Sequence, residues 1–502
     1  MSANPPIARV VVVGSAVPLW LCTTALARAL GPIGVKVSAV ELKTAQIPSQ
    51  VYATLPPLES FHSKLGVEEA ALLRSTAGSF SLGQLFVDGA GSRRPGFFHA
   101  WGSYGAAIDG VAFFPCWLKA KRHGPVASLE SFCPAAVAAH YGRMIRPTVE
   151  VAALGRTEYA YHVPAMAYAR ELKALAPALG VTVYEEGAAQ VVRSGTDGSI
   201  ERLVLDSGRI VQGDLYVDAT GSSARLIGEA PASEWRSWQA HFIVDRLLLA
   251  RAPRFTSVPP FSEVRISRAG WTALNPTQAM TGVAHAYASG LHSEEEAVRL
   301  ASRVGGSALS DITIQPVSPG IQAQPWSANC VAIGSSACML DPIHDISIHA
   351  IQLGIVHLLS LFPAGTEYGA ERTEYNRQMC SSFERLRDFQ CAFYAYSMFV
   401  GDFWQHARRH VAPAELLHKS ETFRARGVIA PMEDETFLAA SWQALFCGLG
   451  IVPDSWGPAT DAISPTRIAE QCQRMLEVIQ ARVTAEPMHD EYLAALCGRA
   501  AA

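Results

Sequence analysis

The chain has 502 residues, of which 49% are hydrophobic and 17% are charged, a composition typical of a globular protein with a large buried core. Its formal net charge of −4 gives no basic field, so nucleic acid is not an expected partner. We find no apolar run of the length expected of a membrane span and no signal-peptide layout, which predicts a cytoplasmic protein without a membrane partner.

The ten cysteines are scattered and form no Cys-x-x-Cys pair. Several of them, such as Cys330, stand inside apolar segments. We therefore predict buried free thiols in preference to disulfides or zinc ligands. No metal site is predicted elsewhere either, because His344 and His349 are five positions apart and would diverge on a helix.

A strand-helix-strand unit is predicted at the start of the chain. A β-branched run over residues 8–13 ends at Gly14, a helix follows to residue 29, and a second strand over residues 35–40 ends at Glu41. Dinucleotide-binding folds place an acidic residue at this point to bond a ribose hydroxyl. The layout therefore predicts an FAD site that includes Gly14 and Glu41.

The glycine fingerprint of that site is altered. Gly14 matches the first glycine of G-x-G-x-x-G, whereas Ala16 and Leu19 stand at the second and third positions. Ala16 adds a methyl group where a pyrophosphate approaches the backbone, and Leu19 adds bulk where the helix packs on the strand. Two readings stay open at this point: a weakened FAD site at Gly14, Ser15 and Ala16, or a purely structural unit whose pocket is filled.

Further strands are predicted over residues 181–185, 200–205 and 215–218. The last of them runs into Asp218-Ala219-Thr220-Gly221. A strand followed by Asp-x-x-Gly is widespread among FAD-dependent monooxygenase-like proteins, so Gly221 is a candidate cofactor contact. An antiparallel sheet is then predicted over residues 235–289.

The segment over residues 329–355 is the most informative part of the chain. A buried strand breaks at Gly334, a turn follows at Asp341-Pro342, and a helix begins with Asp345 or Ser347 placed to cap it. A small-residue loop that leads into a helix presents free backbone N–H groups and a positive dipole end to a ligand. Candidate cofactor contacts are Gly334, Asp341, Ser347 and Ile348.

In order and spacing, this segment resembles the flavin-contacting segment of the flavin-dependent tryptophan halogenases, in which an acid-Pro-x-Glu-Ser-Thr motif precedes the helix. Residues 47–66 resemble the second flavin loop of that family, which reads Gly-Glu-Ala-Thr-x-Pro; Ala53 is kept, and Val51-Tyr52 replaces Gly-Glu. Residues 441–453 resemble its C-terminal landmark. The resemblance extends over nearly all of residues 7–460.

The resemblance implies an α/β fold of the flavin monooxygenase and halogenase type, with an inserted antiparallel sheet and a helical C-terminal lobe. We expect residues 1–360 to form the FAD-binding-type domain, with substrate-side insertions at about residues 97–165 and 230–320. Residues 361–502 are expected to form the helical lobe. The resemblance also implies FAD, reduced by a separate flavin reductase, and a small aromatic substrate. A homodimer is left open as the oligomeric state.

The chain departs from the family pattern where that pattern carries its chemistry. Ser81 stands where the family has the lysine whose ammonium engages hypohalous acid beside the substrate. His344 replaces the family's Glu, and Asp345-Ile346 replaces its Ser-Thr pair. In the Trp-x-Trp-x-Ile-Pro motif the second Trp is Ala273. A serine offers only a neutral hydroxyl, so standard halogenation is not expected.

Two functions follow as alternatives. The chain is either a flavin-dependent oxidoreductase acting on an indole-like substrate by other chemistry, or a catalytically silent relative that binds a ligand or partner in the former substrate cleft. If chemistry survives, we predict that His344 and Asp345 carry it, with neutral His344 as base at a helix start. The alternative is that Asp345 only caps the helix and His344 packs beneath the cleft. Ser81 is the third candidate for a catalytic residue; the alternative is that it is an ordinary serine on a strand.

Overall fold

The computed structural model describes residues 5–89, 96–148, 155–230, 233–306 and 308–498. The chain forms two compact units, each assembled from three separated segments. Unit 1 comprises Met1–Thr76, Val163–Gln239 and Val317–Arg385, and unit 2 comprises Ala77–His162, Ala240–Pro316 and Leu386–Ala502. The predicted boundary at residue 360 stays a prediction.

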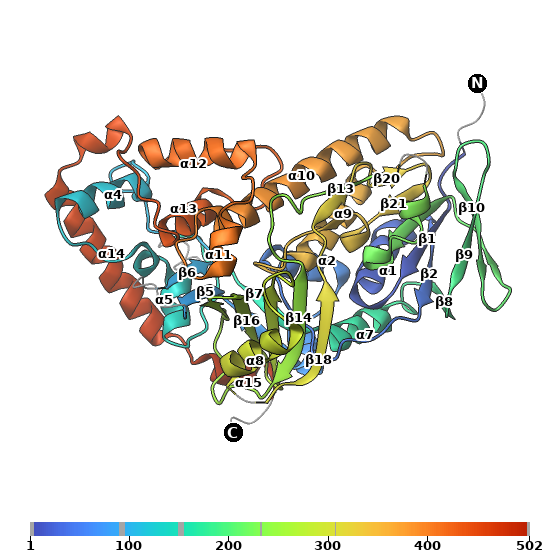
Figure 1. The fold of residues 1–502 in the computed structure, drawn as a ribbon, viewed down its shortest axis with the longest axis horizontal. Coiled ribbons are helices and arrows are strands. Elements are labelled where there is room, and N and C mark those ends of the chain that lie inside the picture. Colours follow the sequence, from blue (N-terminus) through green and yellow to red (C-terminus); the bar gives the residue numbers. More distant parts are fainter. Residues whose placement is uncertain (1–4, 90–95, 149–154, 231–232, 307, 499–502) are drawn as a thin grey trace. The chain divides into compact units, whose positions relative to one another are not determined.

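Unit 1 is built on a six-stranded sheet with the order β20-β21-β12-β1-β2-β8, visible around the blue strands of Figure 1. Its strands are β1 (Arg9–Gly14), β2 (Lys36–Leu42), β8 (Thr182–Glu186), β12 (Leu215–Ala219), β20 (Trp326–Ser327) and β21 (Cys330–Ala332). All neighbours are parallel except β20 and β21. The valine run of β1 is buried along its whole length after Arg9, as expected for a central parallel strand covered on both faces.

Helices pack on this sheet because its strands are apolar on both faces. The helices assigned to unit 1 are α1 (Ala16–Leu30), α2 (Pro57–Leu65), α3 (Glu69–Thr76), α7 (Ala165–Leu175) and α9 (Ser347–Ser360), and α10 (Gly369–Ala395) continues into unit 2. Helix α1 contacts both α7 and α9. The strand-helix-strand unit predicted at the start of the chain is confirmed as β1, α1 and β2. The bounds differ from the prediction by one or two residues.

Smaller strands complete unit 1. A three-stranded antiparallel sheet is formed by β9 (Ala189–Arg193), β10 (Ile200–Leu205) and β11 (Ile210–Val211). A second one is formed by β13 (Trp235–Ser237), β19 (Gly320–Gln322) and β22 (Cys338–Met339). The short strand β3 (Val51–Ala53) lies before α2. Strand β22 was not predicted, because two residues give no readable alternation.

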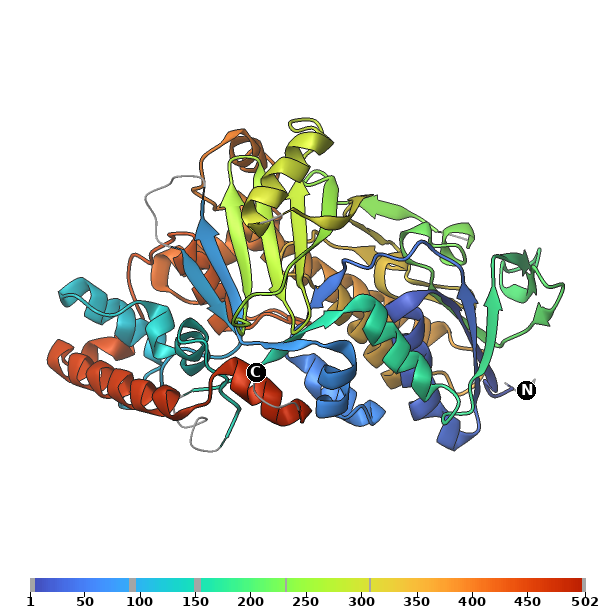
Figure 2. The same cartoon turned by 90° about the horizontal axis from the view of Figure 1, so that it is seen from below.

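Unit 2 contains a seven-stranded sheet with the order β18-β14-β17-β16-β15-β5-β6, whose yellow-green strands stand side by side in Figure 2. Its strands are β5 (Gly83–Asp88), β6 (Phe97–Ala100), β14 (Arg246–Ala252), β15 (Ser262–Ser267), β16 (Gly270–Pro276), β17 (Thr281–Tyr287) and β18 (Ser310–Pro316). The antiparallel sheet predicted over residues 235–289 is present, but β15 pairs with β5 in parallel, so the sheet is mixed.

Helix α8 (Glu294–Gly305) lies across one face of that sheet (Figure 2). Its Ala297 and Ala301 are buried against Leu248, Leu274 and Val283 of the strands. Within the described residues, the other α-helices of unit 2 are α4 (Phe113–His123), α5 (Pro134–His140), α11 (Asp402–Ala407), α12 (Ala414–Arg426), α13 (Ala439–Gly448), α14 (Pro465–Ala485) and α15 (His489–Cys497). Strands β4 (Ser79–Ser81) and β7 (Ala160–Pro164) pair antiparallel.

Two expectations about composition can be compared with the fold. All ten cysteines are free, and eight of them are buried, which confirms the prediction of free thiols. The expectation that no apolar run is long enough to span a membrane was wrong. Residues 16–33 form an 18-residue stretch with a mean hydropathy of 1.3, which is long and apolar enough by length and composition. That stretch contains α1, and 61% of it is buried, as in the core helix of a globular protein.

Candidate functional site

The turn between β1 and α1 leads from the end of a central parallel strand directly into a buried helix. A side chain at Gly14 would place its Cβ 2.3 Å from the carbonyl oxygen of Ala219, so β1 and β12 approach each other at a point where only glycine fits. Ala16 has a φ of 50°, in the left-handed region that favours glycine. Ala16 therefore adopts a backbone conformation that glycine adopts with less strain.

The side chains of the same turn differ from the fingerprint. Ser15 precedes α1 and makes no capping bond with its side chain, which leaves the first helical N–H groups to other acceptors. Pro18 stands at the third helical position and has no N–H to offer. Leu19 is fully buried where the fingerprint has its last glycine. The turn therefore keeps its shape but offers fewer donors and less room.

Glu41, the residue expected to bond a ribose, already has partners within unit 1. Its Oε1 accepts a hydrogen bond from Trp20 Nε1 at 3.0 Å, and its Oε2 lies 2.6 Å from Lys173 Nζ. Lys173 also pairs with Glu185 at 2.6 Å. A carboxylate oxygen has more than one lone pair, so Glu41 can still accept from a ribose hydroxyl, but Trp20 and Lys173 already fix its orientation.

The second predicted flavin loop is tied to the segment that leads into α9. The backbone N–H of Ala53 donates to Asp345 Oδ2 at 2.7 Å. Val51 and Tyr52, which replace Gly-Glu of the family pattern, are both buried, and burial raises the pKa of the Tyr52 phenol. Two stretches separated by 292 positions along the chain therefore meet in unit 1 at Asp345.

The turn before α9 carries an unusual backbone. His344 has a φ of 70° and Asp345 a φ of 44°, two successive left-handed residues other than glycine. Histidine and aspartate are among the side chains that adopt this region most readily. His344 is only 2% exposed, and Asp341 beside it is buried and accepts from the N–H of Ile343 at 2.9 Å. A shaped and partly strained turn of this kind is typical of functional sites.

The predicted cap of α9 needs a correction. The helix begins at Ser347, and the residue in the capping position is Ile346, whose side chain cannot accept a hydrogen bond. Asp345 lies one residue earlier and accepts from the Ser347 hydroxyl at 3.1 Å. Burial raises the pKa of Asp345 to about 6, while hydrogen bonds from Ala53 and Ser347 act in the opposite direction. Asp345 thus holds the helix start from outside the helix.

Asp218 organises the neighbouring turn, a role that was not predicted. Its Oδ2 accepts from the N–H groups of Leu226 and Ile227 at 2.7 and 2.8 Å, and its Oδ1 accepts from Thr220 and from the Ser336 hydroxyl. The Ser336 hydroxyl also lies 3.0 Å from the Gly221 carbonyl oxygen. Gly221 and Gly334 both have left-handed φ values, of 71° and 68°. The Asp-x-x-Gly motif was the signal, since a fully buried carboxylate requires such donors.

Ser81 lies in unit 2, whereas His344 and Asp345 lie in unit 1. Ser81 is the last residue of β4, is 1% exposed, and donates its hydroxyl hydrogen to the Gly83 carbonyl oxygen at 3.2 Å. This is the environment of an ordinary buried strand serine.

A polar row beside Ser81 was also missed from the sequence. The His162 ring lies between two hydroxyls, with Nδ1 3.1 Å from Ser79 Oγ and Nε2 2.9 Å from Ser262 Oγ. Ser79 in turn donates to the Pro276 carbonyl oxygen at 2.6 Å. Burial and the neighbouring His489 lower the pKa of His162 to about 3. No spacing in the sequence joins residues so far apart, so only the strand pairing reveals the row.

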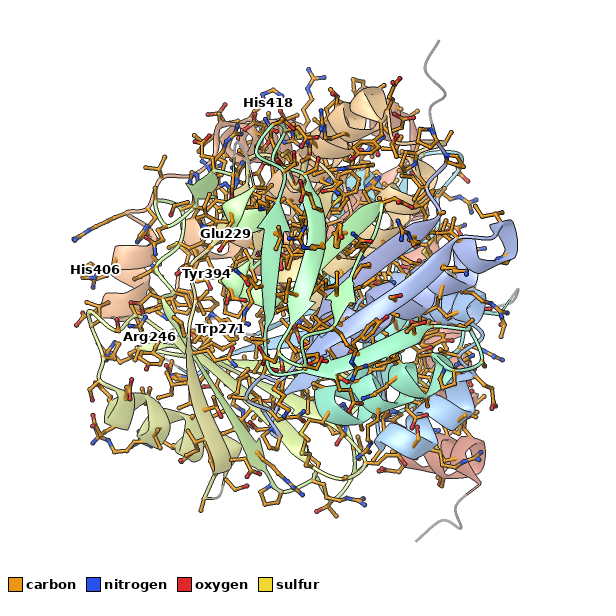
Figure 3. The ribbon with its side chains drawn as sticks, turned by 90° about the vertical axis from the view of Figure 1, so that its right-hand side faces the viewer. Glu229, Arg246, Trp271, Tyr394, His406 and His418 are labelled. Atoms are coloured by element: carbon orange, nitrogen blue, oxygen red, sulfur yellow. The ribbon has the colours of Figure 1, made fainter. Side chains whose placement is uncertain are left out.

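The tryptophan that survives from the Trp-x-Trp-x-Ile-Pro pattern is fixed within unit 2. Trp271 is 1% exposed and donates from Nε1 to the Tyr394 hydroxyl oxygen at 3.0 Å; both side chains are labelled in Figure 3. Tyr394 stacks on Trp404 with ring centroids 6.2 Å apart. The indole therefore anchors the sheet to the end of α10.

The chain can now be compared with known proteins. The family model described as tryptophan halogenase matches residues 9–465, which is most of the chain. The chain belongs to the tryptophan halogenase family. Among curated members, it is 26% identical over 496 residues to tryptophan 6-halogenase ThaL of Streptomyces albogriseolus, covering 92% of each chain.

Solved structures of the halogenase family share the fold. BrvH, a flavin-dependent halogenase from Brevundimonas sp. BAL3, superimposes with a TM-score of 0.92 at 31% identity, over 98% of this chain and all of the other. Xcc4156, a flavin-dependent halogenase from Xanthomonas campestris, superimposes with a TM-score of 0.93 at 28% identity, over 99% of this chain and all of the other. The resemblance inferred from the motifs and the fold class predicted from it are therefore confirmed.

Proposed function

We propose that this family member is a flavin-dependent oxidoreductase that acts on a small aromatic, indole-like molecule by chemistry other than the family's standard halogenation. The proposal rests on the side chain at position 81, which is a serine in this chain. At the position where the family pattern has a lysine, the chain has a buried hydroxyl that donates to the Gly83 carbonyl. A neutral hydroxyl cannot supply the cationic hydrogen bond that holds an oxidised halogen.

The residues of unit 1 support FAD as the cofactor, supplied in reduced form by a separate reductase. Bound reduced flavin would supply the reducing equivalents for oxygen activation. The positive φ of Ala16 fits a tight strand-to-helix turn of the kind that dinucleotides bind, and the Glu41 carboxylate can accept a hydrogen bond from a ribose hydroxyl. Pro18 and Leu19 fit less well, since one removes a donor and the other adds volume. We therefore propose that binding is weak.

The remaining predicted contacts follow from the same segment pair. The turn beside Asp218 contains Gly221 and Gly334. The turn before α9, which Asp345 holds, contains Asp341, and the first two residues of α9 are Ser347 and Ile348. Ala53 is bonded to the second of these turns. These assignments remain proposals, and so do a cytoplasmic location and a homodimer.

His344 and Asp345 are the proposed acid–base groups. The φ values of both residues and the raised pKa of Asp345, which burial moves to about 6, are features that cluster at reactive sites. Asp345 with this pKa can exchange a proton near neutral pH. The competing role is structural, because the Asp345 carboxylate also joins Ala53 to Ser347.

A second candidate function is a silent relative that binds a ligand or partner without catalysis. The buried volume of Leu19, Val51 and Tyr52, placed where the family pattern has glycine or glutamate, favours it. The two functions differ in flavin content. A purified protein that is yellow, or that takes up FAD on titration, supports the oxidoreductase; a colourless protein with no affinity for oxidised or reduced FAD supports the silent relative.

The test of the proposed chemistry combines product analysis with one substitution. The protein is incubated with a flavin reductase, NADH, FAD, oxygen and a panel of indoles, and the products are identified by mass spectrometry. We expect oxygenated product, and we expect His344→Gln to change its pH profile because it removes an imidazole while keeping size and hydrogen bonding. An unchanged rate and pH profile in His344→Gln would leave that residue only its structural role.

A further inference from the structure

Unit 2 contains a cavity of about 480 Å³ that no part of the proposed function uses. It lies between the end of α10, the residues after α11, the last turn of α12 and the loop after α13. The cavity lining includes Tyr396, Met398, Arg408, Arg424, Ile451 and Val452. Its volume falls within the range of about 300–1,000 Å³ found for small-molecule pockets.

Arg424 supplies a cation that is not neutralised. It is exposed near the C-terminal end of α12, and within the part of the chain that the structure describes no carboxylate lies at ion-pair distance from its guanidinium. Arg424 and Tyr396 both line the cavity. Burial raises the pKa of the Tyr396 phenol, and the nearby Arg424 charge lowers it. Glu421, one helical turn earlier, acts on the same phenol in the opposite direction but does not pair with Arg424.

Arg408 supplies a second cation, and its position is fixed. Its Nη1 donates to the carbonyl oxygens of Ser397 at 3.2 Å and Phe399 at 3.0 Å, which hold the guanidinium against the segment that follows α10. In the described residues the other two nitrogens of Arg408 make no hydrogen bond. A guanidinium carries five N–H donors, so donors remain for a ligand after those two bonds.

The wall beside the two arginines is apolar and partly open. Met398 is 57% exposed and Val452 is 54% exposed, which is high for side chains of this kind. Ile451 is only 8% exposed, so this part of the wall is buried. None of the residues that line the cavity is acidic. The cavity thus combines two guanidiniums with an apolar surface.

We propose that this cavity binds a small organic anion, a carboxylate attached to an aromatic or aliphatic body. The carboxylate would lie against the guanidiniums of Arg424 and Arg408, since guanidinium and carboxylate match in a two-bond geometry. The body would cover Met398, Val452 and Ile451. The site is separate from the flavin turns of unit 1, and the proposal does not depend on the proposed function.

The test uses two probes that share a ring and differ in charge, 2-naphthoate and 2-naphthylmethylamine, titrated into the full chain by calorimetry. Arg424→Gln is compared with Arg426→Gln, which removes an exposed arginine of the same helix that does not line the cavity. We expect naphthoate to bind more tightly than the amine. Its affinity should fall about tenfold in Arg424→Gln and by less than about twofold in Arg426→Gln.

Three results would overturn the proposal. One is no heat of binding with millimolar naphthoate, and another is equal affinity for the amine. The third is an Arg424→Gln variant that binds naphthoate as tightly as Arg426→Gln does, which would place any bound naphthoate elsewhere. Because both arginines are exposed, urea unfolding of the two variants is expected to match that of the original protein and so to separate lost binding from lost folding.

Discussion

Asp218 in unit 1 and His162 in unit 2 are both fully buried, yet they are stabilised in different ways. The Asp218 carboxylate accepts hydrogen bonds from backbone N–H groups at both oxygens and from the Thr220 and Ser336 hydroxyls at Oδ1. The His162 ring lies between Ser79 and Ser262, with its pKa lowered to about 3 by burial. One network is built around a charge, and the other depends on a side chain that stays neutral.

The same contrast extends over the two units. Unit 2 contains His99, His162, His285 and His489, whose pKa values burial lowers to about 4, 3, 4 and 4. Unit 1 contains His62 and His349, lowered to about 3 and 4, and Asp345, raised to about 6. Acid therefore destabilises both units, but in unit 1 the raised pKa of the Asp345 carboxyl group partly offsets the loss of stability.

The largest expected effect is on the order in which the units open in acid. Below pH 6.5 a histidine in the unfolded chain binds a proton, whereas the buried ring in the folded protein stays neutral. The free energy of unfolding therefore falls as pH falls from about 6.5 toward the folded pKa. At pH 5 each such ring lowers the free energy of unfolding by about 2 kcal/mol. Hydrogen exchange at pH 7 and pH 5 should therefore show β14, β16 and β17 losing more protection than β1 and β12. Earlier opening of β1 and β12 would contradict this.

Replacement of Asp218 by alanine has the next largest expected effect. The substitution leaves the N–H groups of Leu226 and Ile227 buried without acceptors, and each such group costs about 1–3 kcal/mol. We expect a loss of about 3 kcal/mol or more in urea unfolding. Asp197→Ala is the matched control, because that carboxylate bonds only locally in an exposed turn, and it should cost less than about 1 kcal/mol. Equal costs would show that Asp218 is not the centre of its turn.

His162→Gln tests the neutral network of unit 2. Its amide can still bond to hydroxyls but does not titrate, so the variant lacks this ring's share of the acid sensitivity. The difference in unfolding free energy between variant and original should shift in favour of the variant by about 2 kcal/mol from pH 7 to pH 5. A constant difference over this range would mean that the ring accepts its proton in the folded protein.

Asp345→Asn is expected to give a smaller effect of the opposite sign. Because the folded pKa is raised, the stability that Asp345 contributes is fully present below the unfolded pKa near 3.8 and is lost as pH rises through about 6. The original protein should therefore lose on the order of 1 kcal/mol relative to the variant from pH 4 to pH 7, a value reduced for partial exposure. A difference that moves the other way would place the folded pKa below 3.8.

The sequence predicted the parts of this molecule that depend on local patterns. The valine run that ends at Gly14 and the apolar run over residues 35–40 that ends at Glu41 predicted the strand-helix-strand unit to within two residues. The motif order over residues 329–355 placed β21 and α9. These features follow from periodicity and turn residues, which are readable in a single chain.

Other features depend on contacts between distant segments and could not be predicted. The bond from Ala53 to Asp345 and the row of Ser79, His162 and Ser262 join residues about 80 to 300 positions apart. The left-handed φ of His344 has no sequence signal either: histidine adopts that region more readily than most residues, but most histidines lie outside it. The roles of His344, Asp345 and Ser81 stay predictions.

With serine at position 81, this family member is expected not to halogenate. The most direct measurement is mass spectrometry of reactions that contain the protein, FAD, a flavin reductase, NADH, oxygen, bromide and indole or tryptophan, with catalase present to remove free peroxide. We expect no brominated product above a control without the protein. A brominated product formed at one ring position, and dependent on the protein, would contradict it.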